Sequence, residues 1–191
     1  ACLAEVLAAN SLDPMALVGA RVQGWDGNIR AGGGKYFVLE ADEYQNKLAL
    51  YQPLGVILTS VDYDHPDFFP TVADYERVFA DFLARVPRHG FVVVCGDHAR
   101  AEFLSRDVKA TRYTYGLLDG NDVRATDIRV LTEDERQGGL LQEFTVEFRG
   151  ESIGRFETRL AGRHNIENAL ATIAVALHLK LDLDLVRQGI A

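Results

Sequence analysis

Apolar residues in the first half of the chain follow two alternating patterns. Short continuous apolar runs predict buried strands, and they occupy residues 16–19, 36–39, 55–58 and 91–94. Apolar side chains at helical spacing predict helices at residues 1–9, 72–86 and 97–105. Strands and helices that alternate at this pace indicate a mostly parallel sheet, because parallel neighbours are joined by crossover helices. We expect the strands at 36–39 and 55–58 to be covered on both faces.

Particular residue types mark where some of these elements end. Thr71 is a candidate N-cap for the helix that follows it, and Pro87 ends that helix. Residues 24–34 contain five glycines and predict a mobile loop. Its Gly32-Gly33-Gly34-Lys35 run resembles a phosphate-binding loop only superficially, because it lacks the required spacing and the following Ser or Thr.

The second half of the chain changes to alternating apolar and polar residues. This pattern predicts strands at residues 111–115, 123–131, 141–149 and 152–160, with loops at 119–121 and 137–139. Gly150-Glu151 is a tight-turn signal, so the last two strands should form a hairpin. Helices are expected at 165–179 and 184–190. The expected fold is an α/β domain: a mostly parallel sheet with crossover helices, then an extension of antiparallel strands and terminal helices.

Composition limits the classes of function that fit this chain. Its 191 residues predict one domain, and its 20 basic and 28 acidic residues give a formal charge of −8. This charge opposes nonspecific binding to nucleic acid, although a divalent metal could still bridge carboxylates to a nucleotide. The chain shows neither a membrane-length apolar run nor a signal peptide, and its two cysteines lack metal-ligand spacing. A cytoplasmic protein without a membrane partner is expected, with Cys95 as a small buried hydrophobe.

Three clusters of polar residues could carry chemistry. The first is the acidic run Glu40-Ala41-Asp42-Glu43, which follows the strand at 36–39. Ligands of open parallel sheets bind beyond the carboxyl ends of strands, and carboxylates are the hard oxygen donors that suit Mg²⁺. The alternative is a solvated acidic turn, since exposed acids are common.

The second cluster, residues 59–67, follows the strand at 55–58 and contains His65. We expect it to converge with the acidic run on one crevice, where His65 could bind or position a divalent ion. Pro66 is expected to hold the backbone of His65 extended. The alternative is a polar loop in which Asp64 or Asp67 caps the next turn.

The third cluster, residues 162–169, begins a helix and places Asn165 and Asn168 three positions apart on one face. A carboxamide both donates and accepts hydrogen bonds, which complements the edge of adenine. The alternative is that Asn165 caps the helix and Asn168 faces water. Ala169, Ile173 and Leu177 form the helix's own apolar stripe.

Taken together, these clusters resemble the Mur ligases, specifically the ATP-binding middle domain with its P-loop-NTPase-like fold. The similarity rests on residues 40–44, 51–53, 59–65 and 162–169, in this order and spacing. The resemblance implies that Glu40 and His65 are catalytic residues and bind or adjoin the Mg²⁺ that bridges ATP and substrate. It also implies that His164, Asn165 and Asn168 contact the nucleotide.

Within the family, the chain is most similar to the alanine-adding type. Many members carry a CO₂-modified lysine on the helix after the histidine loop, and Phe79 stands at that position here. The resemblance implies an ATP-dependent ligase that joins L-alanine to UDP-N-acetylmuramate in peptidoglycan precursor synthesis. Tripeptide-recycling and folate-type ligases remain alternatives within the family, and a non-catalytic nucleotide-binding or interaction module is the alternative outside it.

The expected domain is residues 1–191, a central domain without other parts that the family carries. The family's Gly-Lys-Thr or Gly-Lys-Ser phosphate loop, its uridine-nucleotide domain and its carboxy-terminal domain do not occur in this sequence. We therefore expect the fragment to fold without ligase activity and to bind ATP weakly at best, since the backbone cradle for phosphates is missing.

Overall fold

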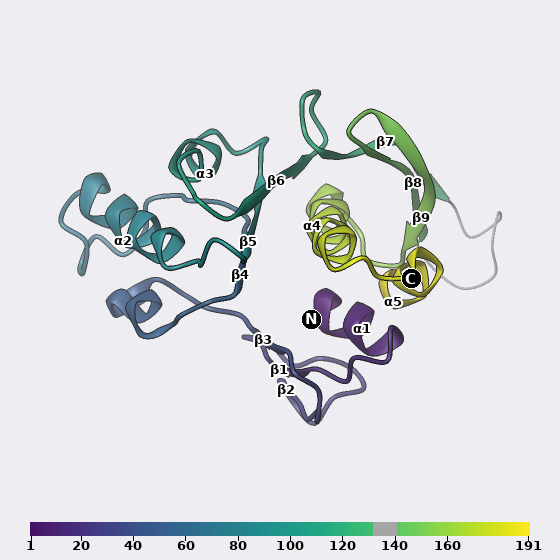
Figure 1. The fold of residues 1–191 in the computed structure, drawn as a ribbon, viewed down its shortest axis with the longest axis horizontal. Helices are drawn as coiled ribbons and strands as arrows, with labels where there is room; N and C mark the ends of the chain where they lie inside the picture. Colours follow the sequence, from purple (N-terminus) through teal and green to yellow (C-terminus); the bar gives the residue numbers. More distant parts are fainter. Residues whose placement is uncertain (132–140) are drawn as a thin grey trace. The chain divides into compact units, whose positions relative to one another are not determined.

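The computed structural model describes residues 1–131 and 141–191, which fall into two compact units (Figure 1). Unit 1 comprises Ala1–Glu40 and Ala125–Ala191, and unit 2 comprises Ala41–Arg124. The loop expected at 137–139 lies outside the described residues. The strands belong to a three-stranded sheet of order β2-β1-β3 and a six-stranded sheet of order β4-β5-β6-β7-β8-β9.

Unit 2 is a parallel α/β arrangement, as the alternating pattern predicts. Its elements are η1 (Tyr44–Leu50), β4 (Gly55–Leu58), α2 (Val72–Ala84), β5 (Phe91–Cys95), α3 (Ala99–Leu104), β6 (Thr111–Gly116) and the start of β7 (Val123–Leu131). The pairs β4–β5, β5–β6 and β6–β7 are all parallel. Strand β5 is almost completely buried, including Cys95, which confirms the prediction for that residue.

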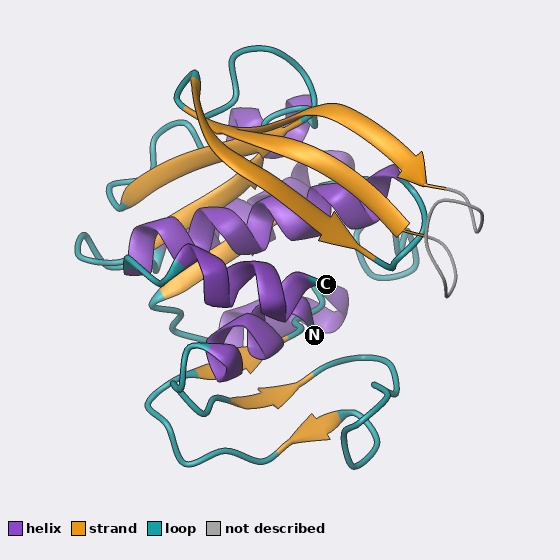
Figure 2. Cartoon of the chain, turned by 90° about the vertical axis from the view of Figure 1, so that its right-hand side faces the viewer, coloured by secondary structure: helices purple, strands orange, loops and turns teal. Residues whose placement is uncertain are grey.

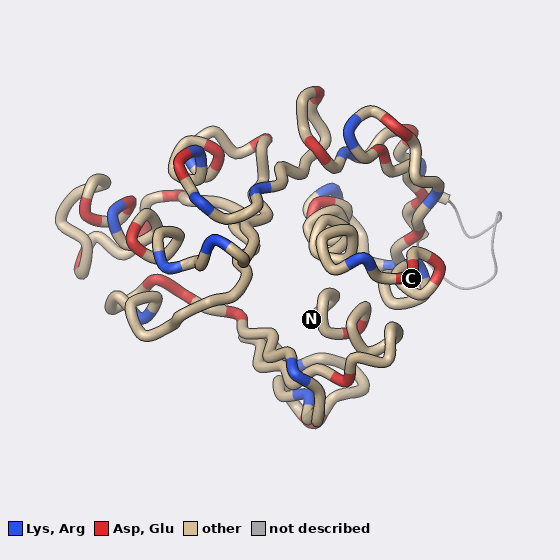
Figure 3. Tube along the Cα trace, in the orientation of Figure 1, with Lys and Arg blue, Asp and Glu red and all other residues tan. Residues whose placement is uncertain are grey.

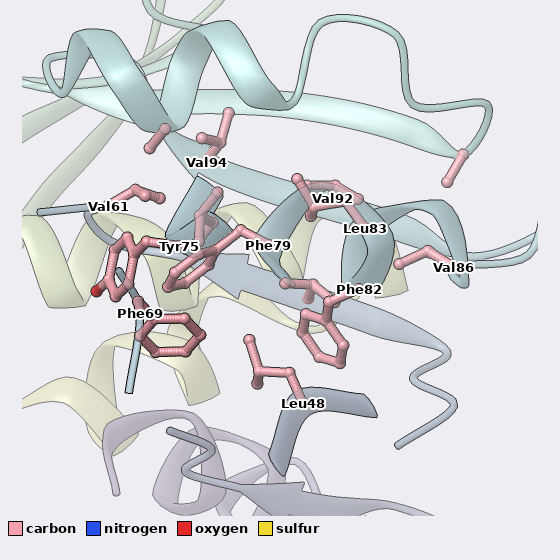
Figure 4. Close-up of a cluster of buried hydrophobic side chains, with 14 residues drawn as sticks. Leu48, Val61, Phe69, Tyr75, Phe79, Phe82, Leu83, Val86, Val92 and Val94 are labelled. Atoms are coloured by element: carbon pink, nitrogen blue, oxygen red, sulfur yellow. The ribbon is translucent and has the colours of Figure 1, made fainter. Parts of the chain in front are cut away.

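The core of unit 2 joins α2 to the sheet. Figure 4 shows the side chains of η1, α2, β4 and β5 meeting in one apolar cluster. Thr71 caps α2, because its hydroxyl accepts a hydrogen bond from the Asp74 N–H, as predicted. On the buried face of the helix lie Tyr75, Phe79, Phe82 and Leu83. Phe79 is therefore a core residue.

Unit 1 combines helices with the remaining strands. Its elements are α1 (Cys2–Ala9), β1 (Met15–Leu17), β2 (Ile29–Arg30), β3 (Phe37–Leu39), most of β7, β8 (Leu141–Phe148), β9 (Glu151–Thr158), α4 (Arg163–Leu179) and α5 (Leu183–Ile190). Helix α1 packs against α4 and α5, which both contact β9. Figure 2 shows these three helices between the β8–β9 hairpin and the three-stranded sheet. None of the helices in the described ranges combines the length and apolar character that a membrane crossing requires.

The antiparallel pairing of β8 and β9 confirms the expected hairpin, although its turn lies one residue earlier than Gly150-Glu151. Phe148 pairs with Glu151, so the loop consists of Arg149 and Gly150, with φ angles of 53° and 85°. Two successive residues with positive φ are typical of a two-residue hairpin turn, and glycine adopts this conformation without steric cost.

The prediction that the strands from residue 111 onward form an antiparallel extension is wrong for β6. This strand pairs in parallel with β5, and two of its residues pair in parallel with β7. The connection between β6 and β7 is a short loop rather than a crossover helix. Asp97 holds that loop, because its carboxylate accepts hydrogen bonds from the N–H groups of Leu117 and Leu118 and from the side chain of Asn121. The loop therefore returns the chain to the level at which β6 ended.

The prediction that β3 is covered on both faces is also wrong. Strand β3 lies at one edge of the small sheet, and Phe37 is 58% exposed. The expected loop at 24–34 contains the short strand β2, which pairs antiparallel with β1. Gly32 and Gly34 of this loop lie directly against the backbone of residues 12–14, leaving no room for a side chain. These glycines therefore allow close packing of two chain segments.

Candidate functional site

Glu40 follows β3 at the end of the first segment of unit 1. Its side chain is exposed, and its Oε2 accepts a hydrogen bond of 3.0 Å from the Gly19 N–H. The structure therefore places an exposed carboxylate just beyond the carboxyl end of the strand, as the sequence predicts. Its catalytic and metal-binding roles stay predictions.

The other acids of the run belong to unit 2 and differ in their surroundings. Figure 3 shows the acidic positions between β3 and η1. Asp42 forms an ion pair of 3.0 Å with Lys47, so its charge is compensated within the turn. Glu43 instead accepts a hydrogen bond of 3.0 Å from the Tyr75 hydroxyl, and its Oε1 lies 3.7 Å from Nε2 of His65. Glu43 is thus the acid of this run that the structure places beside His65.

The backbone of His65 is left-handed, with φ of 56°, so the prediction of an extended conformation is wrong. Three hydrogen bonds to the backbone groups of His65 explain the difference. The His65 N–H donates to Asp64 Oδ1, and the His65 carbonyl accepts from the N–H groups of Phe68 and Phe69. Asp64 therefore does bind the following turn, as the alternative reading of this loop predicts. Left-handed backbone at a non-glycine residue is strained, and such strain clusters at functional sites.

The imidazole of His65 lies between an aromatic ring and two carboxylates. The Tyr44 ring is 4.5 Å away between centroids and tilted by 39°. Nε2 faces Oε1 of Glu43 at 3.7 Å and Oδ2 of Asp64 at 3.9 Å. The side chain of His65 is 37% exposed, so a ligand can still reach it.

Two tyrosines donate hydrogen bonds to acids in this region, and one of these acids, Glu43, faces the imidazole. Burial, the hydrogen bond to Glu43 and the nearby carboxylates raise the pKa of Tyr75 well above its ordinary value. Its hydroxyl therefore remains a donor over the whole physiological pH range. The hydroxyl of Tyr44 donates to Asp67 Oδ2 at 3.1 Å, and this bond raises the pKa of Tyr44.

Magnesium fits these residues only if other donors share its coordination. Glu43, Asp64 and His65 offer carboxylate oxygens and one imidazole nitrogen, and oxygen donors suit Mg²⁺. Among residues 1–131 and 141–191, no group of three acids, histidines or cysteines is placed to hold a metal ion by itself. In proteins, Mg²⁺ is usually bound through one or two carboxylates together with phosphate oxygens and water.

A second histidine, which the sequence patterns did not single out, lies on the same side of unit 2. His98 Nε2 is 3.1 Å from Asp62 Oδ1, and His98 Nδ1 accepts a hydrogen bond from the Ala101 N–H at the start of α3. Because Nδ1 is an acceptor, Nε2 carries the proton and donates to Asp62. The loop that leads to His65 is thereby tied to α3. The position of His98 at the start of the helix predicted at 97–105 was the available signal.

The third cluster lies at the start of α4 in unit 1. Gly162 is the N-cap, so the alternative reading of Asn165 as the cap is wrong. Asn165 lies in the first turn, where its Nδ2 donates to the Ala161 carbonyl and lies 3.1 Å from Nε2 of His164. His164 and Asn168 are exposed, and Asn165 is half-buried. These side chains remain accessible for a nucleotide.

Gln142 supports this helix start from β8. It is only 4% exposed, and its Nε2 donates to the carbonyls of Leu160 and Gly162. Asn165 holds the carbonyl of the residue between them. The segment before α4 is therefore fixed by side chains, a role that the alternating pattern of β8 could not reveal.

The predicted site residues are divided between the two units. Glu40, His164, Asn165 and Asn168 belong to unit 1, whereas His65 belongs to unit 2 with Glu43. The idea that all of them border one crevice stays a prediction.

Comparisons with known proteins identify relatives over nearly the whole chain. The family model described as Mur ligase middle domain matches residues 22–176. The UDP-N-acetylmuramate–L-alanine ligase of Koribacter versatilis is 37% identical over 191 residues, which is 99% of this chain and 40% of that protein. The ligase of the same name from Anaeromyxobacter sp. is 37% identical over 188 residues, 98% of this chain and 40% of that protein. The chain thus spans about two fifths of the length of these relatives.

Solved structures show the same fold. The UDP-N-acetylmuramate–alanine ligase from Thermotoga maritima matches with a TM-score of 0.83 at 22% identity, over 99% of this chain and 40% of that chain. The UDP-N-acetylmuramate:L-alanyl-gamma-D-glutamyl-meso-diaminopimelate ligase from Neisseria meningitides matches with a TM-score of 0.82 at 25% identity, over 99% of this chain and 60% of that chain. The mixed α/β fold with a mostly parallel six-stranded sheet is therefore that of these ligases.

Proposed function

The chain belongs to the Mur ligase family, and from that premise we propose that it is the ATP-handling part of a ligase that joins L-alanine to UDP-N-acetylmuramate. The observation that carries the proposal is the match, over nearly the whole chain, to relatives that bear the name of this ligase. Because the chain spans less than half of those relatives, substrates and activity are part of the proposal.

The proposed reaction has two steps. The γ-phosphoryl group of ATP passes to the carboxylate of UDP-N-acetylmuramate, which gives ADP and an acyl phosphate. The amine of L-alanine then attacks the acyl carbon: a C–N bond forms, phosphate leaves and the amine loses a proton. Both steps bring anions together, so the protein contributes mainly placement and charge neutralisation. Mg²⁺ would supply part of that neutralisation when bound with the nucleotide.

Each predicted site residue has a role in this proposal. Glu40 and His65 would bind or adjoin the Mg²⁺, and the surroundings of His65 support this because carboxylates face its ring. His164, Asn165 and Asn168 would contact the nucleotide at the start of α4, where a carboxamide can bind the adenine edge.

The substrate assignment is tested with the complete protein that contains this chain. Phosphate release is measured with ATP, Mg²⁺ and UDP-N-acetylmuramate in the presence of L-alanine, the tripeptide L-alanyl-γ-D-glutamyl-meso-diaminopimelate, or glutamate. We expect release only with L-alanine. Release with the tripeptide would favour the activity of the Neisseria ligase, whose fold also matches. Glutamate-dependent release when a folate replaces UDP-N-acetylmuramate would favour a folate-type ligase, and nucleotide binding without any release would favour a non-catalytic module.

The role of Glu40 is tested by Glu40→Gln in the same protein. The amide oxygen can still accept the Gly19 N–H, and the position is exposed, so the free energy of unfolding should change by less than about 0.5 kcal/mol. Magnesium-dependent phosphate release should fall by a factor of ten or more, on the order expected for a lost metal contact. Unchanged turnover would remove Glu40 from the proposed site.

A further inference from the structure

The hydroxyl of Tyr75 is a polar group placed at the edge of the apolar core of unit 2. The Tyr75 residue is 4% exposed, and its ring contacts those of Phe69 and Phe79 at centroid distances of 5.2 and 5.1 Å. Figure 4 shows the ring within this cluster, with its oxygen at the edge. Phenylalanine would fill the same space, and burying a hydroxyl costs free energy unless it is bonded. Packing alone therefore does not explain the hydroxyl.

The partner of this hydroxyl is Oε1 of Glu43, at 3.0 Å. The same oxygen faces Nε2 of His65 at 3.7 Å, so one carboxylate oxygen is shared between a buried donor and the imidazole. Glu43 immediately precedes η1, whose second and third residues, Gln45 and Asn46, have positive φ. An acid at the start of such an irregular turn needs an anchor to keep a fixed position, and α2 supplies it through Tyr75.

We propose that Tyr75 is a positioning residue, whose hydroxyl holds the Glu43 carboxylate against His65 and so fixes the imidazole for the magnesium-bound nucleotide. Hydrogen-bonding partners behind the groups that bind a ligand orient those groups, and their removal typically weakens metal affinity or activity by about 10- to 100-fold. The second carboxylate facing Nε2, that of Asp64, lies on the neighbouring residue and also binds the His65 N–H. Asp64 thus holds the ring from the loop of His65 itself. Tyr75 of α2 holds it from the other element, by fixing Glu43.

The functional half of this inference rests on the proposed ligase activity, whereas the structural half does not. Tyr75→Phe removes only the hydroxyl and retains the ring that packs in the core. Tyr51→Phe is the matched control. It removes a hydroxyl from a tyrosine that packs against the same cluster, but it leaves the Tyr75 hydroxyl that bonds to Glu43. Thermal unfolding of both variants shows whether either loses its fold.

The first measurement is the NMR spectrum of the His65 ring in the 191-residue chain at one fixed pH. Tyr75→Phe and Glu43→Gln should move the His65 ring resonances, and the double variant should move them no further than Glu43→Gln alone. Tyr51→Phe should leave them unchanged. Equal effects of Tyr75→Phe and Tyr51→Phe, or additive effects in the double variant, would overturn the proposal.

The second measurement uses the complete protein. Tyr75→Phe should raise the Mg²⁺ concentration for half-maximal phosphate release by about tenfold or more while the KM for L-alanine stays constant. An equal rise in this Mg²⁺ concentration with Tyr51→Phe would show that Tyr75 contributes only packing. If the unaltered protein releases no phosphate with any amino acid, the ligase proposal fails, and the NMR result still decides whether Tyr75 positions His65.

Discussion

At the residue scale, His65 combines a left-handed backbone with an imidazole that two carboxylates face. The hydrogen bonds of Asp64, Phe68 and Phe69 to its backbone maintain this conformation. Such a residue is constrained both by its side chain and by its φ angle, so different substitutions should separate the two constraints.

Asparagine tolerates left-handed backbone, whereas a β-branched residue does not. The free energy of unfolding of His65→Asn should therefore lie within about 1 kcal/mol of that of the unaltered chain. His65→Val should be less stable by a further 1–2 kcal/mol, roughly the cost of the left-handed conformation for a residue with a side chain. Urea unfolding of the chain measures both. Equal stability of the two variants would show that the turn relaxes when the imidazole is removed.

Asn168 allows a test of the nucleotide contact at the start of α4. It is exposed, so Asn168→Ala should change the free energy of unfolding by less than about 0.5 kcal/mol. In the complete protein, loss of an adenine contact should raise the KM for ATP several-fold, with the KM for L-alanine unchanged. Parallel changes in both constants would indicate a packing role instead. Glu167→Ala, which changes the preceding position of α4, is the control.

The chemistry at this scale was partly predictable from the sequence. The pattern located His65 and the acids before η1, because strand ends and turn residues are local signals. It did not predict Glu43 as the neighbour of His65, since that contact depends on the irregular turn at Gln45 and Asn46. Tyr75 was assigned only to the core face of α2, because helical spacing describes where a ring packs and not where its hydroxyl points.

At the element scale, α2 provides both the core of unit 2 and the anchor of the site. Its start is defined by Thr71, whose hydroxyl accepts the Asp74 N–H at 3.1 Å and lies 2.7 Å from Asp74 Oδ2. Because Tyr75 lies in the first turns of α2, fraying of this end would release the partner of Glu43.

Thr71→Ala should lower the free energy of unfolding by about 1 kcal/mol, the typical cost of a lost N-cap. Thr71→Ser retains the hydroxyl and should lose less than half of that. Chemical denaturation compares the variants, and hydrogen exchange at the Asp74 and Tyr75 amides reports fraying directly. A destabilised Thr71→Ala variant with unchanged exchange at these amides would contradict the role of the cap.

Most elements were predicted because their signals are local. The helices, the strands β4 and β5 and the β8–β9 hairpin all follow from apolar spacing and turn residues. The parallel pairing of β6 with β7 was missed because it depends on Asp97, a residue distant in sequence that shapes the loop after β6. The open face of β3 was missed because apolar composition does not show whether a strand lies at a sheet edge.

At the scale of the whole molecule, three groups make folding stability sensitive to acid. Burial lowers the pKa of His178 below its ordinary value of 6.5. Hydrogen bonds from Gly33 and Arg30 lower the pKa of Asp13 below 3.8, and Arg106 and Arg112 lower that of Glu102 below 4.5. In each case the unfolded chain binds more protons, so stability rises with pH through the corresponding range.

The contribution of His178 is fully present above pH 6.5 and is lost as the pH falls through its folded pKa, before the carboxylates contribute. The urea midpoint should therefore decrease as the pH falls below 6.5, and His178→Gln should flatten this step. The exposed His89 provides the control, because His89→Gln should retain it. A step of unchanged size in His178→Gln would assign the acid sensitivity to other groups.

The split of unit 1 along the sequence affects how the protein is made. Residues 41–124 of unit 2 contain their own core and are contiguous, so they can fold while the ribosome is still adding later residues. Helix α1 precedes unit 2 in the sequence, yet its partners α4 and α5 follow unit 2 and are synthesised after it. Its apolar residues Val6 and Leu7, which are buried in the folded protein, therefore lack their partners until unit 2 has been synthesised, and chaperones have most to protect during this interval.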